Sequence, residues 1–414
     1  MKRLAVLFSL GILFMTMVGC STEKESSQHK PGNTDDIQFN QEDYKEIIPS
    51  NNELGFNLFS ELKTDEYLNT FISPTSLFLS LSMLYNGAHG VTQKEIAEVL
   101  GVEDTEVQKL NEANASLMSI MDKKSNHVKL FLANAMWLNE DFQFQEDFVH
   151  PIKSYFHAEA NAIDIHDTKS ADKINNWVKN ATNDKIEQIA DKPLNPDLIS
   201  ILTNAIYFKG SWTYPFDQKQ TKDGTFHLSE KSKKDVSFMK LTEDLEYLND
   251  KEFQAVSLPY GEEEMSMKVF LPKKNSSLKE FEEMLSSKNW KVWNSEFQTK
   301  KGTIILPKFQ IDYETSLNKT LQQLGMESAF NKDANFSRMI QGNDPVWIGQ
   351  VKQKTYIDVN EEGTEASAAT STEMETTSAP VNKPFQMKVN RPFFIAITDD
   401  ETGAILFIGS IYQP

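Results

Sequence analysis

Cysteine and the motifs that mark enzymes are almost absent from this sequence. Cys20 is the only cysteine in 414 residues, so no disulfide can form within the chain. The seven histidines are scattered, and none pairs with a second ligand at the spacing of a zinc site. HExxH, Cys-x-x-Cys, GxSxG, GxxxxGK and GxGxxG patterns are all missing. We therefore expect neither an enzyme nor a metal or cofactor site; a catalytic triad assembled from distant residues is the alternative left open.

Positive charge is scarce as well. Lysine and arginine together number 42 against 60 acidic residues, which gives a net charge of −18 at pH 7. A chain this acidic is repelled by nucleic acids and by anionic lipid surfaces, so it is a poor candidate for binding either. The charge therefore argues against nucleic acid as a partner and identifies no other partner.

Long apolar runs are missing except at the N-terminus. MKRLAVLFSLGILFMTMVGC starts with Lys2 and Arg3, and its apolar run over residues 4–18 is too short to span a membrane. The last four residues resemble the lipobox of bacterial lipoproteins, with Met17 in place of the usual leucine. Residues 1–19 are thus predicted to be a lipoprotein signal peptide, and Cys20 the lipidated residue. The prediction is an exported protein, lipid-anchored at a bacterial cell surface; ordinary signal cleavage and secretion is the alternative.

The remaining sequence divides into a polar segment and one domain. Residues 20–50 are polar and are predicted to be a flexible tether. No internal repeat and no linker-like shift in composition occurs between residues 55 and 360, so residues 51–414 are predicted to form one domain.

Helical and strand patterns alternate within that domain. TQKE (92–95) has the form of a helix-capping box, and Gly101 follows as a stop signal. FFIAI (393–397) and AILFI (404–408) predict a hairpin that is buried on both faces. Mixed helices and largely antiparallel strands predict an α+β fold.

A segment of mostly small and polar residues precedes that hairpin. EEGTEASAATSTEMETTSAP (361–380) has no aromatic residue, and Met374 is its only large apolar one. If residues 364–378 formed a strand, the even positions would be uncharged and the odd positions would carry all three acids, Glu365, Glu373 and Glu375. The residues favour an exposed loop that can become a strand, while a Ser/Thr-rich flexible stalk is the alternative.

The sequence around this segment resembles a known family. IDVNEEGTEASAAT (357–370) is similar to the proximal hinge of the reactive-centre loop of inhibitory serpins. Other serpin-like segments follow the family's order over residues 51–414; they are FISPTSLFLSLSMLYNGAHGVTQKEIAEVLG (71–101), LANAMW (132–137), TNAIYFKGSWTYPF (203–216), VSLPY (256–260), LPKF (306–309), LQQLGMESAF (321–330) and NRPFFIAI (390–397).

The resemblance implies a fold of three β-sheets and about eight or nine helices, with a reactive-centre loop over about 361–389. It also implies irreversible suicide inhibition of a serine protease by a monomeric protein that is not an enzyme and needs no cofactor. The protease serine attacks the loop to give a covalent acyl-enzyme, and the cleaved loop inserts into the main sheet. A non-inhibitory serpin that acts as a binding or surface protein is the alternative.

The resemblance also assigns residues by position. The hinge would be Glu361, Glu362, Gly363, Thr364, Glu365, Ala366, Ser367, Ala368, Ala369 and Thr370. The residues that control sheet opening would be Lys308 and Trp212 in the breach, and Ser73, Ser76, Asn204 and Gln353 in the shutter, where Gln353 replaces a histidine common in the family.

The scissile bond is predicted at Thr377-Ser378 by counting from the hinge, whereas counting back from NRPF leads to the neighbourhood of Val381. Small residues there favour elastase-like or subtilisin-like proteases over trypsin-like ones. Met374 is a secondary site for chymotrypsin-like enzymes, and the sequence neither supports nor excludes papain-type targets.

Overall fold

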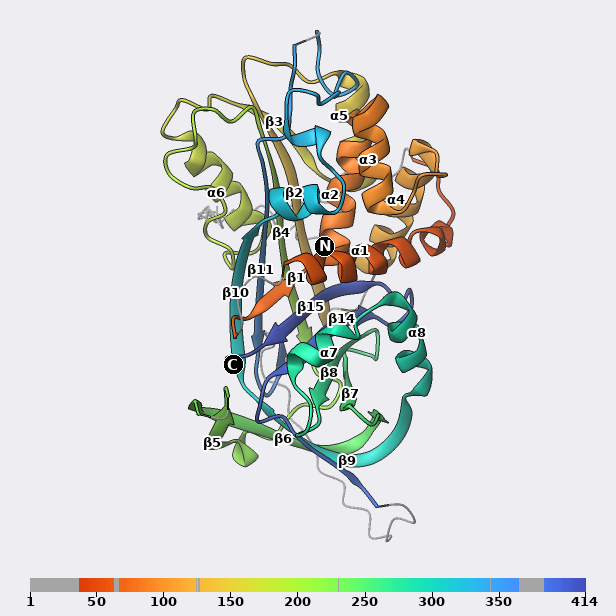
Figure 1. Ribbon diagram of the computed structural model, residues 1–414, viewed down its shortest axis with the longest axis vertical. Helices are drawn as coiled ribbons and strands as arrows, with labels where there is room; N and C mark the ends of the chain where they lie inside the picture. The colour runs from red at the N-terminus through yellow and green to blue at the C-terminus, as the bar shows by residue number, and fades with distance from the viewer. Residues whose placement is uncertain are drawn as a thin grey trace, which may run out of the picture. The chain divides into compact units, whose positions relative to one another are not determined.

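The computed structural model describes residues 37–62, 67–123, 125, 127–229, 231–342, 344–364 and 383–414 (Figure 1). All of them fall within one unit, residues 32–414. The described residues contain nine α-helices: α1 (Ile48–Glu61), α2 (Pro74–Gly87), α3 (Gly90–Leu100), α4 (Val107–Asp122), α5 (Glu146–Phe156), α6 (Ser170–Ala181), α7 (Leu278–Glu283), α8 (Ser287–Glu296) and α9 (Asn318–Gln323). They also contain three short 3-10 helices: η2 (Asp43–Glu46), η3 (Gln218–Gln220) and η4 (Ser328–Phe330).

A six-stranded sheet lies between two layers of helix. Its strands, in spatial order, are β10 (Phe309–Ser316), β11 (Gln350–Val359), β12 (Gly363–Thr364), β4 (Ser200–Ser211), β2 (Val128–Asn139) and β3 (Glu159–Ile163). Figure 1 shows α6 on one side of this sheet and α2 to α5 on the other. β11 and β4 run parallel to each other, as do β2 and β3, and the other pairs are antiparallel.

The second sheet has nine strands. In order they are β1 (Thr70–Ile72), β15 (Ile405–Ile411), β14 (Phe393–Asp399), β8 (Met265–Pro272), β7 (Phe253–Tyr260), β6 (Lys233–Asn249), β9 (Gln298–Pro307) and β13 (Phe385–Lys388), with β5 (Lys222–His227) paired to β6. The resemblance implied three sheets, whereas hydrogen bonds join the described strands into two networks. The reason is that β6 pairs with β7 at one end and with β9 along most of its length.

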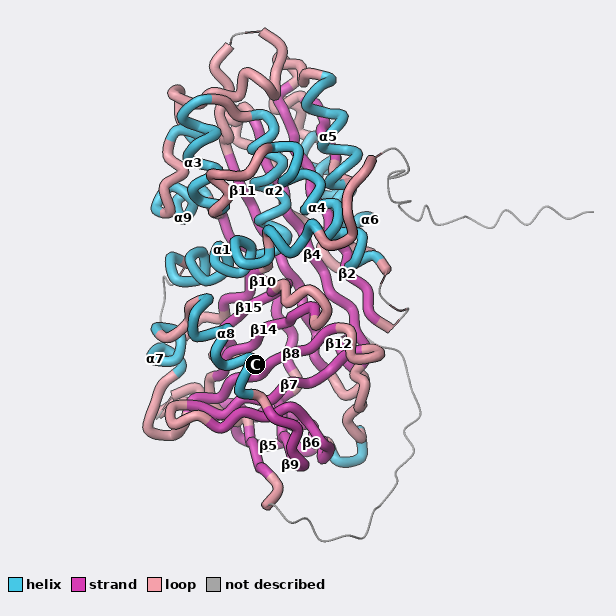
Figure 2. Tube along the Cα trace, turned by 90° about the vertical axis from the view of Figure 1, so that its right-hand side faces the viewer, coloured by secondary structure: helices cyan, strands magenta, loops and turns pink. Residues whose placement is uncertain are grey.

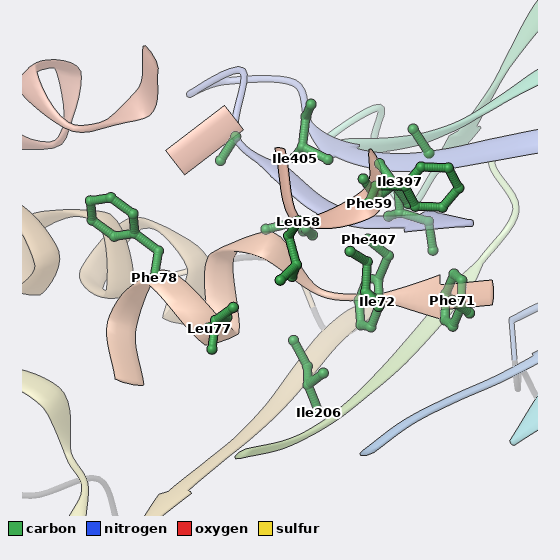
Figure 3. Packing of buried hydrophobic residues seen from close by; sticks show 14 of the residues in the cluster. Leu58, Phe59, Phe71, Ile72, Leu77, Phe78, Ile206, Ile397, Ile405 and Phe407 are labelled. Carbon is green, nitrogen blue, oxygen red and sulfur yellow. The ribbon is translucent and has the colours of Figure 1, made fainter. Parts of the chain in front are cut away.

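Apolar residues from most of the described helices and strands form the main core. The predicted C-terminal hairpin is present as β14 and β15, and every residue of both strands is buried. Phe71 of β1 stacks on Phe407 of β15 with ring centroids 5.1 Å apart. Figure 3 shows these residues beside Leu58 of α1, Leu77 of α2 and Ile206 of β4. Burial of this interface fixes α2 behind the six-stranded sheet.

Two boundary predictions were wrong. Thr92 does not cap a helix: α3 begins at Gly90, and the Thr92 hydroxyl instead contacts the Ser328 hydroxyl at 2.9 Å. Gly101 does end α3, in the left-handed conformation at φ +65°. The predicted tether over 20–50 is too long at its C-terminal end, because Tyr44 and Ile47 are buried and the Tyr44 N–H donates to Ser116 Oγ on α4.

Candidate functional site

The chain reverses direction directly after β11 and enters the six-stranded sheet. The Asn360 N–H donates to the Gly363 carbonyl at 3.0 Å, which closes the reversal. Gly363 and Thr364 then form β12 between two strands. Thr364 is opposite Val359 of β11 on one side and opposite Gly210 of β4 on the other. Gly363 and Thr364 of the predicted hinge are thus already a short central strand.

Glycine is required at position 363. Its φ is +148°, where side chains are strained, and a Cβ there would lie 2.1 Å from the Gly210 carbonyl oxygen. The hinge can therefore approach β4 this closely only because residue 363 has no side chain.

Thr364 is fully buried and has a specific partner. Its hydroxyl is 2.8 Å from the Tyr260 hydroxyl, and both residues have no exposed surface. Burial raises the pKa of Tyr260, and the Thr364 hydrogen bond only partly opposes this, so the phenol stays neutral. Trp212 stacks on Tyr260 with ring centroids 4.2 Å apart. The two rings form the wall against which the hinge enters the sheet.

Glu361 anchors the reversal through an ion pair. Its carboxylate accepts hydrogen bonds from Lys308 Nζ at 2.7 Å and from Thr221 Oγ1 at 2.7 Å. Burial acts to raise the pKa of Glu361, but Lys308 and Thr221 outweigh it and hold the pKa below its usual value. Glu361 of the predicted hinge and Lys308 of the predicted breach are therefore joined by an ion pair.

Trp212 also holds the reversal by hydrogen bonds. Its indole Nε1–H donates to the Asn360 carbonyl at 2.9 Å, and its backbone N–H donates to the Glu362 carbonyl at 3.0 Å. The backbone bond would form with any residue except proline, whereas the bond to the Asn360 carbonyl depends on the indole side chain.

Beyond Thr364, β4 and β11 contact each other directly. We call this parallel contact the seam; it pairs residues 350–356 of β11 with residues 201–207 of β4. The seam begins where β12 ends, and β12 is antiparallel to both of its strands.

A buried hydrogen-bond cluster crosses the seam. Gln353 on β11 donates through Nε2 to Asn204 Oδ1 on β4 at 2.7 Å and to the Ser73 carbonyl at 2.9 Å. Its Oε1 accepts from the Ser73 N–H at 2.9 Å. Asn204 in turn donates to the Ser76 carbonyl at 2.8 Å, and Ser73 caps α2 by accepting from the Ser76 N–H. All four residues are fully buried. The cluster ties the two seam strands to each other and to the start of α2.

The segment between α6 and β4 is joined to the seam by an ion pair. Lys352 of β11, only 6% exposed, pairs with Asp191 of this segment at 2.8 Å and with Glu314 of β10 at 2.9 Å. Burial acts to lower the pKa of Lys352, but the two carboxylates outweigh it and raise the pKa. A cavity of about 460 Å³ lies at the end of the seam remote from β12, between residues 191–198 and residues 349–350.

Comparison with known proteins places this geometry in a family. The profile of the family described as Serpin (serine protease inhibitor) matches residues 49–414. The chain belongs to the serpin family. Bovine Serpin A3-5 is 32% identical, with 89% of each chain covered. The thermophilic serpin tengpin in its native state is 30% identical, with a TM-score of 0.83 over 92% of this chain and 99% of that one. Human thyroxine-binding globulin complexed with thyroxine is 26% identical, with the same TM-score over 90% and 99%.

Serpins are in general protease inhibitors rather than enzymes. Among the described residues of this serpin, no group of three or more histidine, cysteine, aspartate or glutamate side chains could hold a metal ion. No helix in the described ranges is long and apolar enough to cross a membrane.

The structure brings together the predicted breach residues around Glu361 and the predicted shutter residues around Gln353. Several predicted residues lie outside the described ranges: Cys20, Glu365, Ala366, Ser367, Ala368, Ala369, Thr370, Met374, Thr377, Ser378 and Val381. Sequence reasoning missed three contributors to this serpin's site, which are Tyr260, Thr221 and Lys352. Tyr260 stood in the quoted VSLPY segment, but nothing in that motif indicates that its hydroxyl meets Thr364; Thr221 and Lys352 carry no sequence signal.

Proposed function

We propose that this serpin is an irreversible suicide inhibitor of serine proteases with shallow specificity pockets, of the elastase or subtilisin type. The protease serine attacks the Thr377 carbonyl carbon, the bond to the Ser378 nitrogen breaks, and Thr377 remains as an ester on the protease. The freed segment then inserts into the seam and carries the protease with it. The observation that supports this most directly is that Gly363 and Thr364 already lie between β11 and β4.

The register of β12 defines the path of insertion. Continued antiparallel to both neighbours, residue 370 would meet Gln353 and Asn204, and residue 373 would meet Gln350 and Ile201 at the end of the seam. Thr364 faces the core, so residues 366, 368 and 370 would face it too. These are alanine and threonine, which fit a fully buried face.

The energy released favours insertion. Nine further residues in a central strand would form about ten more hydrogen bonds than the seam loses, which is on the order of 10 kcal/mol. The segment after residue 373 would extend toward the cavity near Gly349. Insertion competes with hydrolysis of the acyl-enzyme, so small side chains on the inward face support trapping.

The test is to mix the chain lacking residues 1–20 with an elastase and with subtilisin. The expected result is an SDS-resistant adduct near the summed masses, together with a C-terminal peptide that starts at Ser378. A peptide that starts at another residue would change the assigned scissile bond but would not contradict the mechanism. Cleavage by several proteases without any adduct would overturn the proposal.

The second candidate is a non-inhibitory serpin that acts as a binding or surface protein. The observation that favours it is the similarity to thyroxine-binding globulin, which is solved with thyroxine. Under this function the loop is only a substrate, so cleavage without an adduct is its expected result. The uncharged inward residues of the hinge favour the inhibitor.

We also propose that the protein is monomeric, is exported and is anchored at a bacterial cell surface by lipid on Cys20. The support for export and lipid anchoring is the N-terminal sequence alone, and the monomeric state is what the resemblance to serpins implies. Mass analysis of the mature N-terminus tests it: a diacylglyceryl mass on Cys20, lost together with membrane association in C20S, is expected. An unmodified N-terminus in the culture medium would favour simple secretion instead.

A further inference from the structure

The outer face of the sheet next to the reactive loop carries exposed lysines. β6, β9 and β13 are neighbours, and paired residues on neighbouring strands point to the same side. Lys240 and Lys388 both pair with Ile305, and Lys301 lies four residues before Ile305 on β9, so all three lysines share one face. We call Lys240, Lys301 and Lys388 the lysine face. Figure 2 shows β6 and β9 together at the end of the molecule opposite α3 and α5.

The geometry of the sheet makes this face small and continuous. Four residues along a strand span about 13 Å, and β6 and β13 are two strand spacings or about 10 Å apart. All three side chains are exposed, and none forms an ion pair with another described residue. Lys388 also lies over the Phe238 ring at 5.6 Å. The acids on this face are Asp244, opposite Lys301, and Glu246, which accepts from Thr299.

The charge of this face contrasts with that of the chain. On this face the three lysines stand against two acids, Asp244 and Glu246. Counted over both faces, β5, β6, β9 and β13 contain seven lysines and five acids, whereas the whole chain carries −18. A locally positive surface on an acidic protein attracts negative groups only when they come close, because salt screens charges beyond about 8–10 Å.

The length of the loop brings a protease that close. Six residues lie between Ser378 and Phe385, the first residue of β13, so the two are seven residue steps apart. Seven extended residues reach at most about 25 Å, which is comparable to the radius of a protease domain. A protease bound at the intact Thr377-Ser378 bond, before acylation cuts the loop, therefore has the rim of its active-site cleft next to β6, β9 and β13.

From this we infer that the lysine face is a second contact surface for the target protease, and that it selects proteases with an acidic rim around the cleft. This inference rests on the proposed inhibitory function. The contact acts on the encounter, since exposed charges raise association rates more than they strengthen the final complex. The contact does not change the later kinetic competition between insertion of the loop and hydrolysis of the acyl-enzyme.

The test compares K240Q/K301Q/K388Q with the matched control K109Q/K153Q/K173Q, whose lysines are also exposed, on α4, α5 and α6. The probes are two subtilisins that differ only by Glu→Gln and Asp→Asn substitutions on the rim of the cleft. Association rate constants are measured at 25 and 500 mM NaCl, together with the number of inhibitor molecules consumed per protease trapped.

With the acidic-rim subtilisin at 25 mM salt, the lysine-face variant should associate about three- to tenfold more slowly than the control variant. The difference should vanish at 500 mM salt and with the neutral-rim subtilisin, and the number consumed per protease should not change. Equal association rate constants for both variants at low salt would overturn the inference. If the variants still form SDS-resistant adducts in that case, the proposed inhibitory function is unaffected. Failure of the unmodified chain to form any adduct overturns both.

Discussion

Replacing Gln353 by leucine tests whether the cluster across the seam keeps the sheet closed. The change removes three hydrogen bonds and leaves the Ser73 N–H and Asn204 Oδ1 buried without a partner, while the Ser73 carbonyl keeps its bond from the Leu77 N–H. Each lost hydrogen bond costs at least about 1 kcal/mol, so the closed form should lose about 3 kcal/mol. With a urea dependence of about 3 kcal/mol per molar, the unfolding midpoint should fall by about 1 M.

The same variant should convert faster to a form with the loop inserted. Insertion of residue 370 separates Gln353 from Asn204 in any case, so the lost bond destabilises the closed form alone. About 1 kcal/mol corresponds to about a fivefold faster loss of inhibitory activity at 45 °C. The matched control is Q310L on the exposed side of β10, which should shift the midpoint by less than about 0.2 M. An unchanged midpoint and an unchanged rate in Q353L would refute the reasoning.

A histidine at position 353 should make the stability depend on pH. To accept the Ser73 N–H the imidazole must stay neutral, so its pKa in the folded state would be lowered. Its stabilising contribution is then present above the unfolded pKa of about 6.5 and is lost as pH falls below it, by up to about 1.4 kcal/mol per pH unit. Urea midpoints of Q353H and wild type between pH 5 and 8 check this; parallel profiles would contradict it.

Three other changes test the hinge and the seam. T364R should still be cleaved but should trap almost no protease, because a guanidinium cannot be buried beside Tyr260. The control T364S should trap protease normally. The ratio of adduct to cleaved chain on SDS gels distinguishes the two outcomes. Glu361 has a lowered pKa, so its contribution is present above its ordinary value of 4.5 and is lost as pH falls further. Wild type should therefore lose about 1 kcal/mol more than E361Q between pH 6 and 3.5, an amount kept small because Lys308 is 40% exposed; equal losses in urea titrations would exclude the ion pair as the cause. D191N should speed insertion about twofold, because it removes the Lys352 ion pair that ties residues 191–198 to β11; the activity half-life at 45 °C measures this. D197N on the same segment should leave the half-life unchanged. An unchanged or longer half-life in D191N would contradict this reasoning.

The sequence made the buried hairpin and the hinge predictable for different reasons. Residues 393–397 and 404–408 are apolar without interruption, so burial alone determines their place. The hinge and its partners came from long quoted motifs, because Glu361 and Lys308 are 53 residues apart and no local pattern pairs them.

Other features could not be read from the sequence. TQKE has the local form of a cap, but Thr92 and Glu95 instead hold Ser328, which is 233 residues from Glu95. Tyr44 and Ile47 are apolar residues in a polar segment, and the segment itself does not indicate that they are buried or that Tyr44 binds α4. The number of hinge residues already inserted as β12 likewise depends on the relative stability of the β12 pairings and of the β4–β11 pairing. That difference in stability is a property of the tertiary structure.

The strand directions in the six-stranded sheet have a mechanical consequence. Parallel pairing is slightly less stable per residue than antiparallel pairing, because its hydrogen bonds are slanted. The only parallel contact in the interior of the described sheet is between β4 and β11, since the other parallel pair, β2 and β3, lies at an edge. We therefore expect the sheet to separate first between β4 and β11. A strand inserted there antiparallel to both replaces one parallel contact by two antiparallel contacts. The sheet can then reopen at this place only by losing an antiparallel contact, which is more stable per residue.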